Sequence, residues 1–144
     1  MDTRALLERL YDLLVASHGR LGQTIERIDP ETEDRPIEAY PCGQSGVIAF
    51  IGDYVLSGWE RSDLPAAPRD AYRRLHERLK ARGFTYHMVY PLNGRSVILT
   101  RKLGAVPTGV DADGYVHYIL TLEAFEKAAA EHLHREASDH GQEV

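Results

Sequence analysis

The sequence has a single cysteine, Cys42, and no long hydrophobic run. One thiol excludes an internal disulfide and any zinc or iron–sulfur site built on several cysteines. No apolar stretch approaches the roughly 20 residues that cross a bilayer, and the N-terminal stretch MDTRALLERLYDLLV is charged where a secretory signal would be apolar. These absences predict an intracellular protein without a membrane segment, whose fold depends on its core alone.

The composition is typical of one globular domain. The chain has 144 residues, of which 43% are hydrophobic and 27% charged, and these values exclude a disordered or collagen-like protein. The sequence shows no internal repeat and no linker long enough to divide it. We therefore expect a single domain over residues 1–144, with a polar tail over 136–144 that frays.

Charge is segregated along the chain, although the net charge is only −5. Residues 1–40 hold nine acidic and five basic side chains. Residues 41–105 hold five acidic and ten basic ones, and residues 106–144 hold eight acidic and two basic ones. Most of the basic excess lies in one predicted helix, at Arg69, Arg73, Arg74, Arg78, Lys80 and Arg82. Such a helix suits a phosphate ligand, and a solvated outer face is the simpler alternative. The overall acidity argues against a nucleic-acid-binding protein.

Apolar residues at three- and four-residue spacing predict four helices. Asp2 and Thr3 are suited to cap the first, and Thr121 is suited to cap the last. The predicted helices cover residues 3–18, 68–83, 94–103 and 122–134. The polar residues 22–36 are expected to form a loop with a short extended piece at 24–28.

Segments rich in β-branched and aromatic residues predict six strands. They cover residues 37–40, 47–51, 54–56, 84–90, 106–110 and 115–121. Gly52-Asp53 and the DADG sequence at 111–114 are typical of hairpin turns. Antiparallel hairpins combined with at least one helical crossover predict an α+β fold with helices on both faces of a mixed sheet.

The segment Asn93–Gly104, NGRSVILTRKLG, resembles the strand-to-helix segment of the GCN5-related N-acetyltransferase (GNAT) superfamily. In that family a strand ends at an asparagine, a small residue follows three places on, an aliphatic residue six places on, and a Leu-Gly pair closes the helix. The corresponding residues are Asn93, Ser96, Leu99, Leu103 and Gly104. The arginine-rich helix before this strand and the DADG hairpin after it follow the family's order. The resemblance covers residues 47–121, and a strand and helix of an unrelated α/β protein is the alternative.

The resemblance implies a mostly antiparallel mixed sheet that opens beside Asn93, with helices on both faces and an additional N-terminal helix. It implies acetyl-CoA or another acyl-CoA as the cofactor, no metal, and direct attack of an amine on the thioester. Asn93 would orient the ligand, and Thr100 would be the hydroxyl nearest to the leaving sulfur. The residues that the resemblance assigns to cofactor binding are Asn93, Ser96, Arg69, Arg73 and Arg74.

Two departures from the family's pattern predict weak or absent catalysis. Members cradle the pyrophosphate with a loop of the form Arg/Gln-x-x-Gly-x-Gly/Ala. Between Tyr54 and Tyr72 this chain has one glycine, and Pro65 and Pro68 lack N–H donors. Many members place a tyrosine, which resembles a general acid, where this chain has Thr100, whose hydroxyl is a poor proton source at neutral pH.

Degenerate GNAT-like proteins of bacteriophages, including internal virion proteins, keep the helix and lose the pyrophosphate loop. The alternative to a weak N-acyltransferase is therefore a non-catalytic phage virion or host-interaction protein, located in the cytoplasm or in the virion. Such a protein would have a protein partner or self-associate, through its N-terminal helix or its acidic C-terminal helix.

Other reactive side chains form no pattern typical of a known site. His132 and His134 point in different directions on a helix, so no metal site is expected. The DADG turn lacks the downstream glutamate of a calcium loop, and the sequence GQSG lacks the strand-to-helix context of a nucleophile elbow. His87 and His117 lie in apolar strands and are expected to be core or surface residues, although both would approach one cleft if their strands are neighbours.

Overall fold

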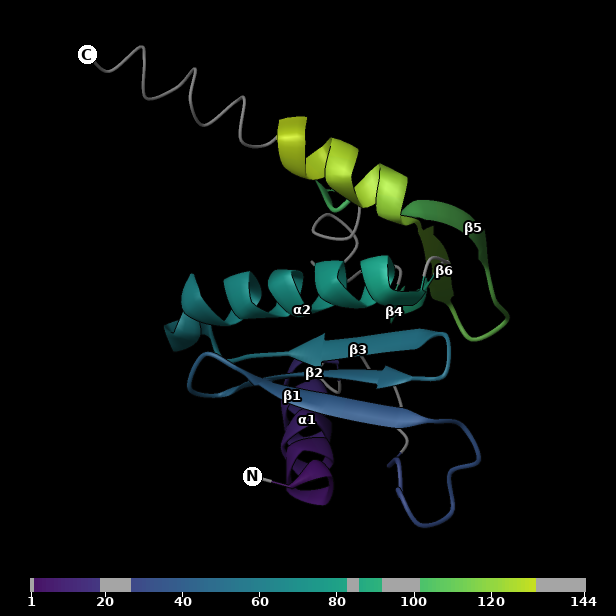
Figure 1. The fold of residues 1–144 in the computed structure, drawn as a ribbon. Helices are drawn as coiled ribbons and strands as arrows, with labels where there is room; N and C mark the ends of the chain where they lie inside the picture. Colours follow the sequence, from purple (N-terminus) through teal and green to yellow (C-terminus); the bar gives the residue numbers. More distant parts are fainter. Residues whose placement is uncertain (1, 19–26, 83–85, 92–101, 132–144) are drawn as a thin grey trace, which may run out of the picture.

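The computed structural model describes residues 2–18, 27–82, 86–91 and 102–131 (Figure 1). In chain order the elements are α1 (Thr3–His18), β1 (Ile37–Cys42), β2 (Gly46–Ile51), β3 (Tyr54–Gly58), the short 3₁₀ helix η2 (Arg61–Asp63), α2 (Ala66–Arg82), β4 (Tyr86–Pro91), β5 (Val106–Val110) and β6 (Tyr115–Leu120). Residues 122–131 follow as a helix. Within these ranges every helix is too short or too polar to span a bilayer.

The strands form one six-stranded sheet in the order β1-β2-β3-β4-β6-β5. Every neighbouring pair is antiparallel except β3–β4, which is parallel. A parallel pair needs a crossover connection, and α2 provides it. The predicted α+β class with a mixed, mostly antiparallel sheet is therefore confirmed.

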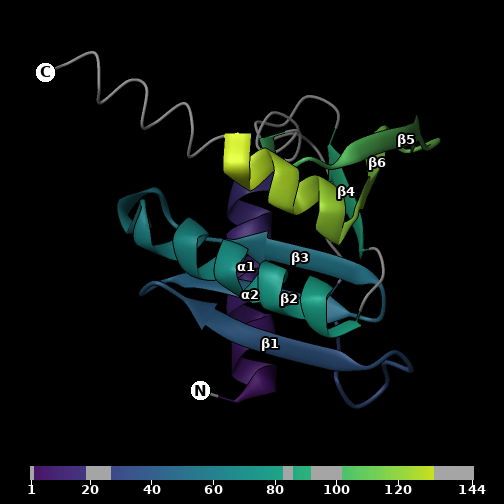
Figure 2. The ribbon, with the colours of Figure 1, turned by 45° about the horizontal axis from the view of Figure 1, so that its top comes forward.

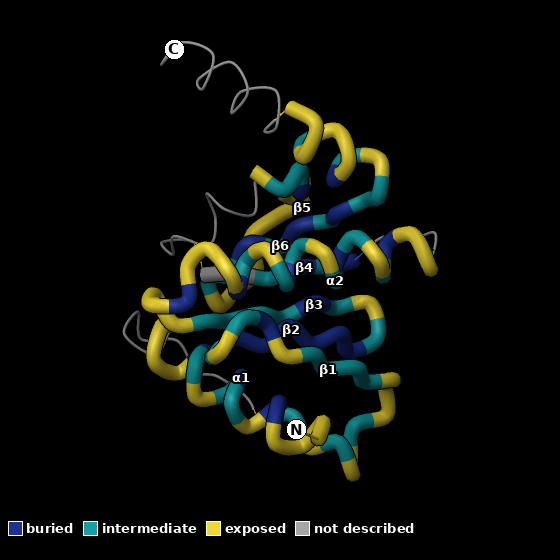
Figure 3. The backbone as a smooth tube through the Cα atoms, turned by 60° about the vertical axis from the view of Figure 1, so that its left-hand side comes forward, coloured by how far each residue is buried: buried dark blue, intermediate teal, exposed yellow. Residues whose placement is uncertain are grey.

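Helices cover both faces of this sheet, as the sequence predicts (Figure 2). The reason is the alternation of side chains along β2, whose six residues are all buried. Val47 and Ala49 pack in one cluster with the leucines of α1. Ile48 and Phe50 pack in a second cluster with the apolar stripe of α2 and with Phe125. Figure 3 shows β2 as a buried strand between these layers and β5 as an exposed strand at the sheet edge.

The ends of the helices follow from local chemistry. Asp2 Oδ1 accepts a hydrogen bond from the N–H three residues on at 2.8 Å, and Thr121 Oγ1 accepts the equivalent bond at 3.1 Å. The predicted caps at Asp2 and Thr121 are confirmed, whereas Thr3, the other candidate for the first helix, is its first helical residue. α2 begins at Ala66, two residues before the predicted start at Pro68. Pro68 is tolerated inside the first turn because the N–H groups of that turn have no intrahelical acceptor, so the missing N–H removes no helical bond.

The predicted strands agree with the structure to within two residues, and both predicted hairpins form, between β2 and β3 and between β5 and β6. Three predictions fall wholly or mainly outside the described residues. They are the extended piece at 24–28, the helix over 94–103 and the frayed tail over 136–144. The last predicted helix is described as helical through residue 131.

Candidate functional site

The junction between β3 and β4 differs from the other strand pairs. β2 and β3 pair at five positions and β4 and β6 at six, but β3 and β4 pair at a single position, Tyr54 with His87. His87 N–H donates to Asp53 O at 2.7 Å. Both strands continue for four residues, to Gly58 and Pro91, without a further registered pair. Because the strands are parallel, the sheet separates at their carboxyl ends, and Figure 2 shows β4 turned away from the line of β3. We call this region the β3–β4 junction.

Aromatic and charged side chains gather beside this single pair. The ring centroids of Tyr54 and His87 are 5.4 Å apart, and the Arg35 guanidinium lies 5.6 Å from the centre of the Tyr54 ring. Glu33 Oε1 accepts a hydrogen bond from Arg35 Nε at 2.7 Å, and this bond raises the pKa of Arg35. His87 Nδ1 is buried and has no hydrogen-bond partner among the residues that the structure describes. A buried polar atom of this kind costs free energy unless something satisfies it, so the β3–β4 junction holds an unsatisfied polar group.

The three arginines predicted to meet phosphate lie on α2 in different surroundings. Arg69 is exposed. Arg73 Nη2 is 3.5 Å from Asp70 Oδ1 in a mostly exposed pair. Arg74 is half-buried, with its guanidinium 4.3 Å from the centre of the Tyr40 ring on β1. The structure therefore places Arg69 and Arg73 at the surface and turns Arg74 onto the sheet.

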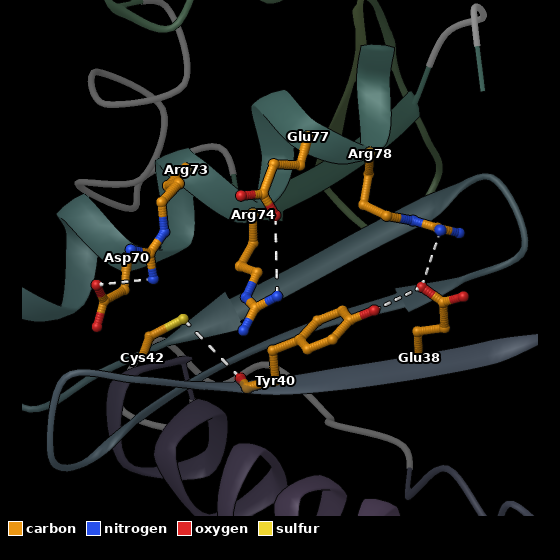
Figure 4. Close-up of polar contacts among 8 residues, drawn as sticks. All are labelled: Glu38, Tyr40, Cys42, Asp70, Arg73, Arg74, Glu77 and Arg78. Carbon is orange, nitrogen blue, oxygen red and sulfur yellow. Dashed lines mark hydrogen bonds and ion pairs between the residues drawn. The ribbon is translucent and has the colours of Figure 1, made fainter. Parts of the chain in front are cut away.

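Arg74 and Arg78 form a polar cluster with β1 (Figure 4). Glu38 Oε2 is 3.0 Å from Arg78 Nη1, and it also accepts a hydrogen bond from the Tyr40 hydroxyl at 2.9 Å, which raises the pKa of that tyrosine. Arg74 Nη1 is 3.8 Å from Glu77 Oε2. The four-residue spacing of the two arginines puts them on one face of the helix. These guanidinium groups are already partnered by this chain's own side chains.

The turn between β1 and β2 presents several backbone N–H groups to a carboxylate of the same chain. The N–H groups of Gln44 and Ser45 donate to Asp63 Oδ2 at 3.0 and 2.7 Å, and the Ser45 hydroxyl donates to the same atom at 2.7 Å. The bonds from Ser45 lower the pKa of Asp63. Gly43 N–H donates to Asp70 Oδ2 at 2.8 Å. Converging N–H groups form an anion-binding hollow, and Asp63 fills this one.

Gly43 is required by this arrangement. Its φ of 59° is in the left-handed region, and a Cβ at this position would lie 2.4 Å from Asp63 Oδ1. The GQSG sequence is therefore a turn that receives a carboxylate from η2, the short helix before α2.

His87 and His117 lie on neighbouring strands, β4 and β6. Val89 is registered opposite His117, and Met88 and Val116 belong to the core on the α2 side. Alternation along each strand therefore places both histidines on the opposite face of the sheet. His117 Nε2 is 2.8 Å from the carboxylate of Asp111 in the adjoining hairpin.

The remaining predicted site residues, Asn93, Ser96 and Thr100, lie outside the described residues. β4 ends at Pro91, two residues before Asn93. The roles of these three residues, and their position relative to α2, stay predictions. In the described part of the chain, no group of three or more His, Cys, Asp or Glu side chains is arranged to hold a metal ion.

Comparison of the chain with models of protein families, with curated proteins and with solved structures found no match. The functional argument is therefore built on the fold, on the β3–β4 junction and on the side chains around it.

Proposed function

We propose that this protein has a GNAT-like fold with a degenerate acyl-CoA site at the β3–β4 junction, and at most weak acyl-CoA-dependent N-acyltransferase activity. The observation that carries the proposal is the parallel pairing of β3 and β4 at the single position of Tyr54 and His87. The GNAT resemblance implies a sheet that opens beside a strand ending at Asn93. The order of α2, β4 and the β5–β6 hairpin is also the order that the resemblance implies.

The backbone at the β3–β4 junction suits an extended ligand that carries amide groups. Asp53 O accepts a hydrogen bond from His87 on β4. Every second residue of a strand directs its N–H and C=O groups to the same side, so the N–H and C=O of Ser57, four residues on, also point toward β4. Ser57 lies three residues beyond the single registered pair. The pantetheine arm of coenzyme A contains two amides, and an extended arm of this kind binds a separated strand edge as an added strand does.

The charged groups support the description of the site as degenerate. Arg73 and Arg74 have acidic neighbours, and the N–H groups that converge at the β1–β2 turn bind Asp63. Of the predicted phosphate ligands on α2, Arg69 is the one without a described ion pair. We therefore expect the phosphates of coenzyme A to contribute little to affinity and the acyl-pantetheine arm to contribute most.

The proposed chemistry is direct acyl transfer to an amine. The chain supplies positioning and backbone hydrogen bonds rather than a covalent intermediate. In this proposal Asn93 and Ser96 contact the ligand, and the Thr100 hydroxyl donates a hydrogen bond to the leaving sulfur. Because that hydroxyl is a poor proton source at neutral pH, turnover is slow.

Isothermal titration calorimetry with fragments of the cofactor tests the proposal. Acetyl-pantetheine should bind within about tenfold of acetyl-CoA, a difference of about 1.4 kcal/mol, and 3′-phospho-ADP should give no heat. Absence of heat with acetyl-CoA at millimolar concentration, for folded protein, removes the proposal.

Two variants locate the binding site. Ser57→Pro removes the N–H that faces the β3–β4 junction without removing a bond of the β2–β3 ladder, so it should abolish binding. Ser57→Ala keeps the backbone and should bind as the unchanged protein does. Thermal melts of both variants show whether the fold is retained, and equal binding by the two folded variants would place the ligand elsewhere.

A second candidate function is that of a non-catalytic GNAT-like phage virion or host-interaction protein. The occupation of the converging N–H groups by Asp63 favours it, because a ligand phosphate meets a carboxylate there. In that case α1 or the acidic helix over 122–131 is the proposed contact surface. Native mass spectrometry should then show an oligomer or a bound partner. A strictly monomeric protein that turns over acetyl-CoA would exclude this candidate.

A further inference from the structure

An aspartate–histidine pair lies at the carboxyl edge of β4. Antiparallel pairing places Tyr115 opposite Pro91, the last residue of β4, and His117 opposite Val89. β4 is also one side of the β3–β4 junction. The pair formed by His117 and Asp111 is therefore one strand away from that junction, at the end where the sheet separates. Neighbouring strands such as β4 and β6 lie about 5 Å apart.

The hairpin holds the carboxylate of this pair in a fixed position. Asp111 Oδ1 accepts hydrogen bonds from the N–H groups of Asp113 and Tyr115 at 2.9 and 3.0 Å. Its other oxygen, Oδ2, is 2.8 Å from His117 Nε2. In the neutral imidazole, a proton on Nε2 donates to the carboxylate and leaves the lone pair on Nδ1. The side chain of His117 is 34% exposed, so solvent and solutes can reach it.

The neighbouring groups distinguish His117 from His87. Among the described strand residues, the other titratable side chains on this face are Tyr115, His87 on β4 and Tyr54 on β3. The segment before β1 adds Arg35, paired with Glu33, beside the Tyr54 ring. His87 Nδ1 is buried, which prevents it from taking a proton from a solute directly. Asp113 adds a second carboxylate to the hairpin. This local negative charge attracts a cationic substrate.

We propose that His117 accepts a proton from a cationic alkylamine that serves as the acyl acceptor, and that Asp111 is its positioning residue; this rests on the proposed function. The ammonium group gives one proton to His117 Nδ1, and the freed lone pair attacks the thioester carbon. The C–N bond forms and the C–S bond breaks. The leaving thiolate takes the second proton that nitrogen loses as the amide forms. The expected substrates are polyamines or lysine side chains rather than neutral or acidic amines.

Steady-state kinetics with spermidine and acetyl-CoA, followed by thiol release, tests this role. A positioned general base contributes about 100-fold or more to turnover, so His117→Gln should lower kcat about 100-fold with little change in KM for acetyl-CoA. Asp111→Asn removes the carboxylate that orients the His117 ring, so it should lower kcat with little change in KM for acetyl-CoA, and it should cause no further loss in a His117→Gln background.

His76→Gln is the matched control. His76 Nε2 is 3.0 Å from Glu126 Oε1, and its side chain is 35% exposed, but this pair joins α2 to the helix over 122–131 on the other face of the sheet. It should leave kcat and the KM for acetyl-CoA unchanged.

The outcomes separate this inference from the function on which it rests. A large rise in KM for acetyl-CoA in Asp111→Asn, additive losses from Asp111→Asn and His117→Gln, or equal losses in His117→Gln and His76→Gln would overturn the role of His117. Binding of acetyl-CoA without acylation of spermidine or of a lysine peptide would overturn this inference and leave the cofactor site standing. Failure to bind acetyl-CoA would overturn both.

Discussion

Replacement of Gly43 by alanine should destabilise the fold through its contact with Asp63, and Gly114 provides a matched control. Both glycines have a left-handed conformation, with φ of 59° and 84°. A Cβ at Gly43 would lie 2.4 Å from Asp63 Oδ1, whereas a Cβ at Gly114 would meet no atom within 4 Å. The two substitutions therefore share the cost of backbone strain and differ in the clash.

The expected magnitudes follow from these two terms. An alanine in the left-handed region costs roughly 1–2 kcal/mol of the free energy of unfolding. At Gly43 the methyl group also displaces the carboxylate from the N–H groups of Gln44 and Ser45, and each lost hydrogen bond costs about 1 kcal/mol. We expect losses of about 1.5 kcal/mol for Gly114→Ala and about 3.5 kcal/mol for Gly43→Ala. The melting temperature should fall by about 5 °C and about 10 °C.

Urea unfolding followed by circular dichroism and by the fluorescence of Trp59 measures both variants. A double-mutant cycle then assigns the excess loss to Asp63. In an Asp63→Ala background, Gly43→Ala and Gly114→Ala should cost the same. The reasoning is refuted if the two variants lose equal stability in the original chain, or if the excess at Gly43 persists without Asp63.

Three further outcomes concern single side chains. The hydrogen bonds from Ser45 hold the pKa of Asp63 in the folded protein below its ordinary 3.8. The ionised Asp63 therefore stabilises the fold above pH 3.8, and this stabilisation is lost as the pH falls through the lowered pKa. In urea titrations below about pH 4, the free energy of unfolding of Asp63→Asn should therefore fall less than that of the unchanged protein. The same dependence of this free energy on pH in both proteins would contradict the role of Asp63. Burial raises the pKa of the Cys42 thiol to about 11. Ellman's reagent at neutral pH should therefore react slowly with Cys42 until urea unfolds the chain. Rapid reaction of the native protein would contradict the burial of this thiol. Leu79→Ala in the core should lower the free energy of unfolding by about 3 kcal/mol, measured by chemical denaturation, and the exposed Lys80→Ala by less than about 0.5 kcal/mol. Similar losses in the two variants would contradict the burial of the apolar stripe of α2.

Much of the fold could be predicted because its determinants are local. Asp2 and Thr121 cap helices through bonds that span three residues, and the turn at Gly52-Asp53 is fixed by residue types that favour it. The alternation of Val47, Ile48 and Ala49 along β2 is not visible as an amphipathic pattern, because both faces are buried. The helices on either side nevertheless follow from their own periodicity.

The candidate site was less predictable, because its contacts join distant segments. The basic spacing of Arg74 and Arg78 indicates a shared helix face, but nothing in the sequence pairs Arg78 with Glu38, forty residues earlier. Asp63 ends the short 3₁₀ helix η2 and bonds to a turn 18 residues before it. The glycines of GQSG were the available signal for that contact. Whether His87 and His117 share a face depends on strand order, which the spacing of segments does not determine.

The burial of every residue in β2 also affects the chain before it folds. Gly46–Ile51 reads GVIAFI, an uncharged segment without proline and rich in β-forming residues. Such segments associate between molecules when they are exposed. In the native sheet β1 and β3 occupy both of its edges and the two helices cover its sides. We therefore expect newly synthesised or refolding chains at high concentration to be the ones that associate through this segment, before those neighbours have docked.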